Sequence, residues 1–179
     1  MFADVSLHWE INGLDVLLIA SRVLHILGAI ILLGGLIFVR HVVKPTVPPG
    51  TPDAFFDGRR ASWAKWIGIS TALLLLSGLF NYIYILMGLE RMAKPYHMLA
   101  GIKILLSLAL FMLAALLAGK TALAQRLREK FYVWLTVAVL LGIAIVILGA
   151  VLRTLPRTPK AANVEASIIA PAIPLAIQN

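Results

Sequence analysis

The sequence has no cysteine among its 179 residues. This absence excludes a disulfide framework, a thiolate metal site and a cysteine nucleophile. Acidic residues are also scarce, with 8 Asp and Glu against 16 Lys and Arg. None of these acids falls inside the long apolar runs of the chain. A cation buried in such a run therefore has no carboxylate partner at its own depth.

Apolar residues, by contrast, are abundant. They make up 61% of the chain, whereas a soluble domain contains about 45–50%. The composition therefore predicts an integral membrane protein. A net charge of +8 would favour nucleic acid as the partner of a soluble protein, but here the basic residues flank apolar runs. We therefore expect a lipid bilayer with anionic headgroups as the partner, and no nucleic acid.

Four apolar runs are long enough to cross a bilayer. The first, from Val16 to Val39, holds about 24 residues, and at about 1.5 Å per residue it spans a hydrocarbon core of about 30 Å with some tilt. Short connections favour antiparallel neighbours, so the expected fold is all-α, an antiparallel four-transmembrane-helix bundle. We expect this domain to cover residues 1–153 and an Ala/Pro-rich tail to cover residues 154–179. The expected spans are residues 16–39, 67–87, 96–117 and 132–152.

The distribution of Lys and Arg between the loops predicts the orientation. The loops after the first and third runs carry nine basic residues: Arg40, Lys44, Arg59, Arg60, Lys65, Lys120, Arg126, Arg128 and Lys130. The opposite side carries five: Arg91, Lys94, Arg153, Arg157 and Lys160. Because cytoplasmic loops are enriched in Lys and Arg, this bias places both termini on the non-cytoplasmic side, in a membrane of the bacterial inner-membrane type.

Polar side chains from three of the runs are expected at one depth. We place the midpoint of each run at the bilayer centre. His25 then lies about 4 Å, and Lys103 about 6 Å, from that centre toward the non-cytoplasmic side. Arg22, Asn81 and Tyr82 fall about 6–8 Å to the same side. An ionised Lys or Arg near mid-membrane is costly and usually faces a partner or a cavity. The sequence therefore predicts a cationic layer in the outer half of the bundle, with its counter-charge supplied from elsewhere.

An anionic ligand can supply that counter-charge. Haem propionates or a lipid phosphate would do so, and a quinone would accept hydrogen bonds instead. Neutral imidazole is a common ligand of haem iron, so His25 is a candidate axial ligand. Simpler interpretations of the same residues stay open. Arg22 can extend outward to Asp15, and His25 can hydrogen-bond to a neighbouring helix. Lys103 can be present as the neutral amine.

The first run also resembles the first helix of a known superfamily. His25 is followed by an apolar turn, then by Gly34-Gly35-Leu36, Phe38 and Arg40. This order is similar to that of the copper-resistance D (CopD) superfamily and of the related HemJ-type protoporphyrinogen oxidases.

The third run adds to this resemblance. It opens with Pro95-Tyr96-His97 and has Lys103 six residues later. A CopD-type helix is similar in opening with Tyr-Gly and in placing a Lys six residues after that Gly. In this chain His97 occupies the Gly position.

The resemblance implies a function. HemJ-type proteins pair a first-helix His with a third-helix Lys and bind b-type haem, which implies haem b as the cofactor here. The implied role is electron transfer, or that of a membrane oxidoreductase component. The cofactor-binding residues are then expected to be His25, Lys103, His97, Arg22, Asn81 and Tyr82. The candidate iron ligands are His25 with Lys103, or His25 with His97.

Two other functions are compatible with the sequence. A CopD-like copper carrier is favoured by Met87, Met92 and Met98, which lie near His97 in the chain, because thioethers and imidazole suit Cu(I). A non-catalytic structural subunit of a larger membrane complex is favoured by the almost purely apolar fourth run and by the tail. A homo-oligomer would be equally compatible with these two features.

Overall fold

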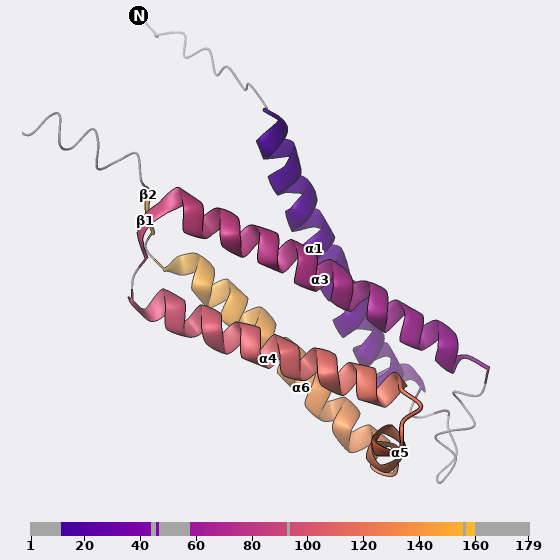
Figure 1. Cartoon of the computed structure of the whole chain (residues 1–179). Coiled ribbons are helices and arrows are strands. Elements are labelled where there is room, and N and C mark those ends of the chain that lie inside the picture. The colour runs from indigo at the N-terminus through magenta and orange to yellow at the C-terminus, as the bar shows by residue number, and fades with distance from the viewer. Residues whose placement is uncertain (1–11, 44–45, 47–57, 93, 156, 160–179) are drawn as a thin grey trace, which may run out of the picture.

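The computed structural model describes residues 12–43, 46, 58–92, 94–155 and 157–159. Within these residues four helices are long and apolar enough to cross a membrane (Figure 1). They are α1 (Gly13–Phe38), α3 (Arg60–Gly88), α4 (Lys94–Ala118) and α6 (Phe131–Thr154). The predicted four-helix membrane bundle is therefore confirmed. Most of the predicted tail, residues 160–179, lies outside the described residues.

Shorter elements extend or connect these helices. The π-helix η1 (Val39–Val43) continues α1, and α5 (Ala122–Arg128) lies between α4 and α6 in the chain. Strands β1 (Leu89–Met92) and β2 (Arg157–Pro159) pair antiparallel. Because β1 follows α3 and β2 follows α6, this small ribbon ties the ends of those two helices together (Figure 1).

All four long helices begin earlier than their predicted apolar runs, and the difference is largest for α1 and α3. At α1, Asn12 Oδ1 accepts a hydrogen bond from the Asp15 backbone N–H at 3.0 Å, and the Asp15 carboxylate accepts from the Asn12 N–H at 3.2 Å. This reciprocal capping box satisfies N–H groups at the helix start that have no partner within the helix. Helix α3 starts at Arg60 and carries Trp63 and Trp66 in its first turns, as expected for a helix that emerges into the membrane interface.

The bundle consists of two closely packed helix pairs. Helix α1 packs chiefly on α3, and α4 packs chiefly on α6, while α3 and α4 touch less extensively. Figure 1 shows α1 crossing α3, and α4 running beside α6. Gly28 allows the first crossing, because a Cβ at this position would lie 3.1 Å from the Ser70 carbonyl oxygen and 3.0 Å from Leu74 Cγ. Small residues at such crossings let helix backbones approach closely in membranes.

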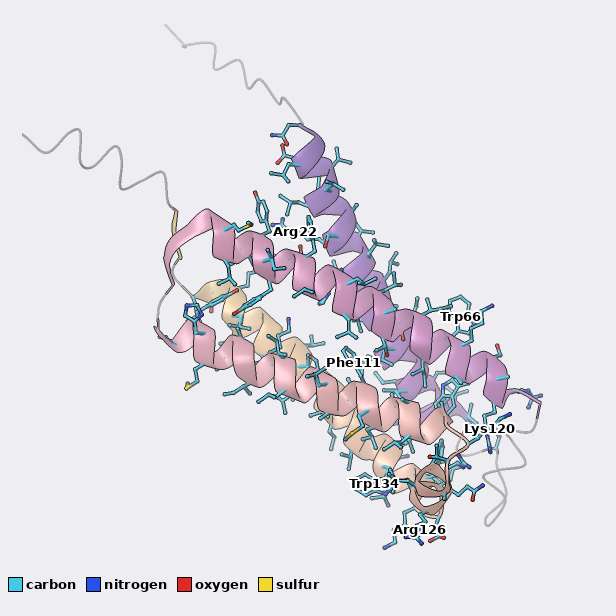
Figure 2. The ribbon with its side chains drawn as sticks, viewed as in Figure 1. Arg22, Trp66, Phe111, Lys120, Arg126 and Trp134 are labelled. Carbon is cyan, nitrogen blue, oxygen red and sulfur yellow. The ribbon has the colours of Figure 1, made fainter. Side chains whose placement is uncertain are left out.

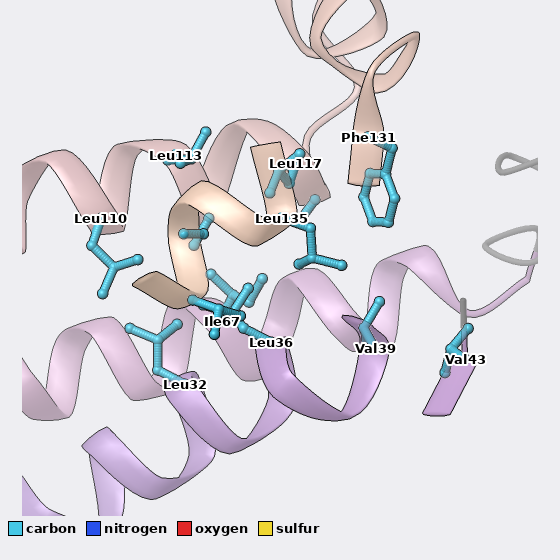
Figure 3. Close-up of a cluster of buried hydrophobic side chains, with 14 residues drawn as sticks. Leu32, Leu36, Val39, Val43, Ile67, Leu110, Leu113, Leu117, Phe131 and Leu135 are labelled. Carbon is cyan, nitrogen blue, oxygen red and sulfur yellow. The ribbon is translucent and has the colours of Figure 1, made fainter. Parts of the chain in front are cut away.

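Buried apolar side chains form two clusters at different levels of the bundle. The larger cluster draws on all four spans and includes Leu36, Leu117 and Leu135 (Figure 3). The smaller one contains Tyr96, Ala100 and Leu152, and Tyr82 packs against it. The polar residues of the candidate site fall between these two levels.

Candidate functional site

His25 is held against α3 by a chain of two hydrogen bonds. Its Nδ1 lies 2.9 Å from Ser77 Oγ. The Ser77 hydroxyl in turn donates to the carbonyl of Leu73, one turn earlier on α3. A hydroxyl has only one proton to donate, so Ser77 Oγ is the acceptor in its contact with His25. We therefore assign the proton to Nδ1, which leaves the lone pair of the neutral ring on Nε2.

The α1–α3 crossing is shaped around this imidazole. A Cβ at Gly78 would lie 3.2 Å from His25 Cε1, so the ring lies directly over that glycine. One turn before His25 on α1, the Ser21 hydroxyl donates to the Ser77 carbonyl at 3.3 Å. Ser21 and Ser77 are both buried. The seam between the two helices is therefore polar at this level, and its hydrogen bonds orient His25.

Lys103 approaches the same level from the second helix pair. Its Nζ lies 3.5 Å from the position that a Cβ at Gly149 would take, so the amine rests on the α6 backbone. The side chain is partly buried. One helix pair thus contributes an imidazole and the other an amine.

His25, Ser77 and Lys103 form a polar layer, and on α3 and α4 its residues lie between the two apolar clusters. His25 precedes Leu32 on α1, and Lys103 lies between Ala100 and Leu110 on α4. Similarly, Ser77 precedes Tyr82 on α3. Packed apolar side chains therefore lie on both sides of the layer on α3 and α4, and on one side of it on α1. Such surroundings strengthen electrostatic interactions and make an uncompensated charge costly.

No carboxylate joins this layer within the part of the chain whose side chains are described. Asp15 caps the start of α1, and Glu129 is exposed at the end of α5. The possible contact between Arg22 and Asp15 does not appear among the ion pairs and hydrogen bonds of the described residues. The layer therefore has an amine and an imidazole, but no acidic partner among those residues.

The other predicted site residues are placed differently. Arg22 is exposed on α1 (Figure 2). Asn81 is partly buried, one turn beyond Ser77, and Tyr82 packs on the smaller apolar cluster. His97 is exposed, with its ring edge-on to that of Tyr96 at a centroid distance of 6.1 Å. His25 thus lies against α3 and Lys103 against α6, while His97 stands about nine ångströms along α4 from Lys103.

The methionines that suggested copper are not gathered around an imidazole. Met87 is 75% exposed at the end of α3, and Met98 is 62% exposed on α4. The Met92 side chain lies outside the described part of the chain. No group of three or more His, Cys, Asp or Glu side chains in the described residues is arranged to hold a metal ion.

Ser77 was not among the predicted site residues, although it orients His25. A signal for it exists in the sequence. Ser70 and Ser77 are seven residues apart on α3, which places both on one face, and Ser21, His25 and Gly28 follow a spacing of four and three on α1. This spacing is typical of two helices that pack along a shared seam.

Comparisons with known proteins found no relative of this chain. No protein-family model matches the chain, and neither a curated protein nor a solved structure matches it.

Proposed function

We propose that this chain is a membrane protein that binds b-type haem, acting in electron transfer or as a component of a membrane oxidoreductase. The observation that supports this proposal best is the hydrogen-bond chain from His25 through Ser77 to Leu73. A histidine that ligates a metal usually donates its other ring N–H to a neighbouring acceptor, which fixes the tautomer and the orientation of the ring. Ser77 provides such an acceptor for Nδ1 and leaves Nε2 as the ligand atom.

The residues of the polar layer fit the chemistry of haem. His25 offers one imidazole nitrogen for the iron. Lys103 offers an amine, either as a second ligand or, when protonated, as a partner for a propionate. Arg22 is exposed one turn away from His25 on α1, where its guanidinium can pair with the second propionate.

Charge balance supports the same ligand. A protonated Lys103 in an apolar surrounding needs an anionic partner, and the described side chains of the layer include none. Two carboxylates on one apolar ring system would balance Lys103 and Arg22 together. When bound, haem supplies a one-electron redox centre. The residues of the chain hold it, orient the ligand nitrogen and exclude water.

The orientation in the membrane is part of this proposal. Basic side chains gather at the end of the bundle where α3 begins and α4 ends, and Figure 2 shows Lys120 and Arg126 there. We place this end in the cytoplasm and both termini on the opposite side, in a membrane of the bacterial inner-membrane type. The haem layer then lies in the outer half of the bilayer.

The test is the absorption spectrum of the purified protein, recorded oxidised and reduced. We expect a Soret band in the wild-type protein and its loss in His25→Ala. His97→Ala is the matched control, because it removes an exposed imidazole outside the layer. Lys103→Met tests the second ligand through a change in the band positions. The absence of a Soret band from the wild-type protein, or its persistence in His25→Ala, would contradict the proposal.

The structure offers less support for the two alternatives. Copper carriage would need soft ligands that converge, whereas Met87 and Met98 are both exposed and extend from different helices. A purely structural subunit would have no need for an oriented imidazole beside a buried amine. Metal analysis that found bound copper, or purification with fixed partners and no cofactor, would favour one of these functions instead.

A further inference from the structure

A cavity of about 370 Å³ lies between α3 and α4, separate from the layer of His25 and Lys103. Its α3 wall runs from Ala64 to Leu75, and its α4 wall runs from Phe111 to Gly119. At about 1.5 Å per residue these walls are about 16 Å and about 12 Å long. The cavity is therefore an elongated slot that starts at the basic end of the bundle and extends toward the bilayer centre.

Small side chains create this slot. Ala64, Gly68 and Ala72 follow one another at intervals of four residues on α3, and the opposite wall includes Ala115 of α4 and Gly119, the residue that follows α4. A Cβ at Gly68 would have no atom within 4 Å. The two helices touch less extensively than the members of either helix pair, so these residues leave space where larger side chains would fill it.

The wall of the slot is apolar. Phe111 projects from α4 toward α3 (Figure 2). Thr71 also lines the slot, but its hydroxyl oxygen is fully buried, so the part of Thr71 that faces the space is carbon. An elongated, partly open apolar slot suits a hydrocarbon chain better than a polar ligand.

Cations stand at the mouth of the slot. Lys65 precedes Gly68 by three residues and therefore shares its face of α3, and Lys120 directly follows Gly119. Both lysines are exposed. At this end of the bundle Glu129 is the only acidic residue among the described side chains; the described Lys and Arg residues are Arg40, Arg59, Arg60, Lys65, Lys120, Arg126, Arg128 and Lys130. A negatively charged headgroup is the complement of this mouth.

We propose that the slot binds one anionic phospholipid, with an acyl chain between α3 and α4 and its phosphate against Lys65 and Lys120. This lipid fills the gap between the two helix pairs. The inference is independent of haem binding, because no residue of the slot belongs to the polar layer.

Native mass spectrometry of the full chain in detergent tests this inference, with phosphatidylglycerol and phosphatidylcholine of the same acyl chains as probes. We expect the wild-type protein to retain one phosphatidylglycerol in preference to phosphatidylcholine. Gly68→Leu fills the slot and should weaken phosphatidylglycerol binding by about tenfold, the equivalent of losing the burial of about two methylene groups. The double variant Lys65→Gln/Lys120→Gln should still bind lipid but lose the preference for phosphatidylglycerol.

Matched controls are available in the same chain. Gly34 on α1 is also exposed, and a Cβ there would likewise have no atom within 4 Å, so Gly34→Leu should leave binding unchanged. Arg126→Gln removes an exposed charge of the same end and should leave the preference unchanged. Equal retention by the wild-type protein and Gly68→Leu would overturn the proposal. So would a second copy of the chain or a bound quinone, found in place of the phospholipid.

Discussion

Ser77 is the residue through which α3 holds His25. It accepts from the imidazole, donates to Leu73 and, through its own carbonyl, accepts from Ser21. Ser77→Ala should release the ring, so that its proton is no longer confined to Nδ1. The loss of one buried acceptor should also lower the free energy of unfolding by about 1–3 kcal/mol. Nitrogen-15 NMR of the imidazole reports the first effect, and unfolding in detergent reports the second.

Ser70→Ala is the matched control for this substitution. Ser70 is a fully buried serine of the same helix, and its hydroxyl donates to the carbonyl of Ile67 at 2.9 Å. It makes no hydrogen bond to His25, so its replacement should leave the tautomer unchanged. An imidazole spectrum that is the same in Ser77→Ala and in wild-type protein would contradict the assigned tautomer.

Gly28 is a second residue whose replacement has a defined consequence. In Gly28→Ala the new methyl would lie 3.1 Å from the Ser70 carbonyl oxygen and 3.2 Å from Leu73 Cβ. The α1–α3 crossing would have to widen, at an expected cost of about 1–3 kcal/mol in unfolding free energy. A Cβ at Gly35 would have no atom within 4 Å. Gly35→Ala should therefore leave the unfolding free energy unchanged or raise it. Equal stability of the two variants in the same unfolding assay would refute the tight crossing.

Single residues of the site were predictable to different degrees. Depth along a helix follows from counting residues, so the sequence could predict one level for His25 and Lys103. The face that a residue presents was harder to predict, because lipid and the protein core are both apolar and the spans lack a strong polar side. The exposure of Arg22 could not be predicted for this reason, and Ser77 was overlooked although it contacts His25.

At the scale of elements, Arg128 links α5 to the end of α4. It is only 4% exposed, and its guanidinium donates to the carbonyl of Gly119, just beyond α4. A cation at a helix C-terminus satisfies carbonyls that have no partner within the helix and interacts favourably with the helix dipole. Arg128→Gln should therefore loosen α5 and the last turn of α4, and lower the unfolding free energy by about 2–3 kcal/mol.

Hydrogen exchange is the measurement for this prediction. Amide protection should fall over Leu116 to Leu127 in Arg128→Gln and stay unchanged in Arg126→Gln, since Arg126 is exposed on the same short helix. Equal protection in both variants would show that Arg128 does not hold the two helices together.

The boundaries of the elements show where hydropathy stops being informative. Helix α1 begins at Gly13 because Asn12 and Asp15 cap it. Capping residues are polar, so a search for apolar runs places the start of the helix too late. Helix α3 extends back to Arg60 through a stretch with interfacial tryptophans. The ribbon of β1 and β2 depends on pairing between segments more than 60 residues apart in the chain, which no local pattern reveals.

At the scale of the whole molecule, the number and order of the spans were predictable because a membrane imposes a minimum length on each apolar run. How the helices pair was not predictable from the same pattern. The pairing depends on close contacts at glycines, such as that of Gly28 with the Ser70 carbonyl and that of Gly149 with the Lys103 side chain. These contacts are set by individual small residues in spans that are apolar on all sides.

The absence of cysteine makes the proposed orientation directly testable. Single substitutions Lys120→Cys and His97→Cys place one thiol at each end of α4, at exposed positions. We expect a membrane-impermeant maleimide to label His97→Cys in intact cells or spheroplasts, and Lys120→Cys only after the membrane is opened. The reverse pattern would show that the termini face the cytoplasm.

We propose that the polar layer between the two helix pairs holds haem through His25. The haem-to-protein ratio of the purified protein, with haem measured as its pyridine complex, decides whether it does. The wild-type protein should contain about one haem per chain, and His25→Ala should contain almost none while keeping its helical content. A wild-type protein without haem even after reconstitution, or a ratio that is the same in both proteins, would contradict the claim.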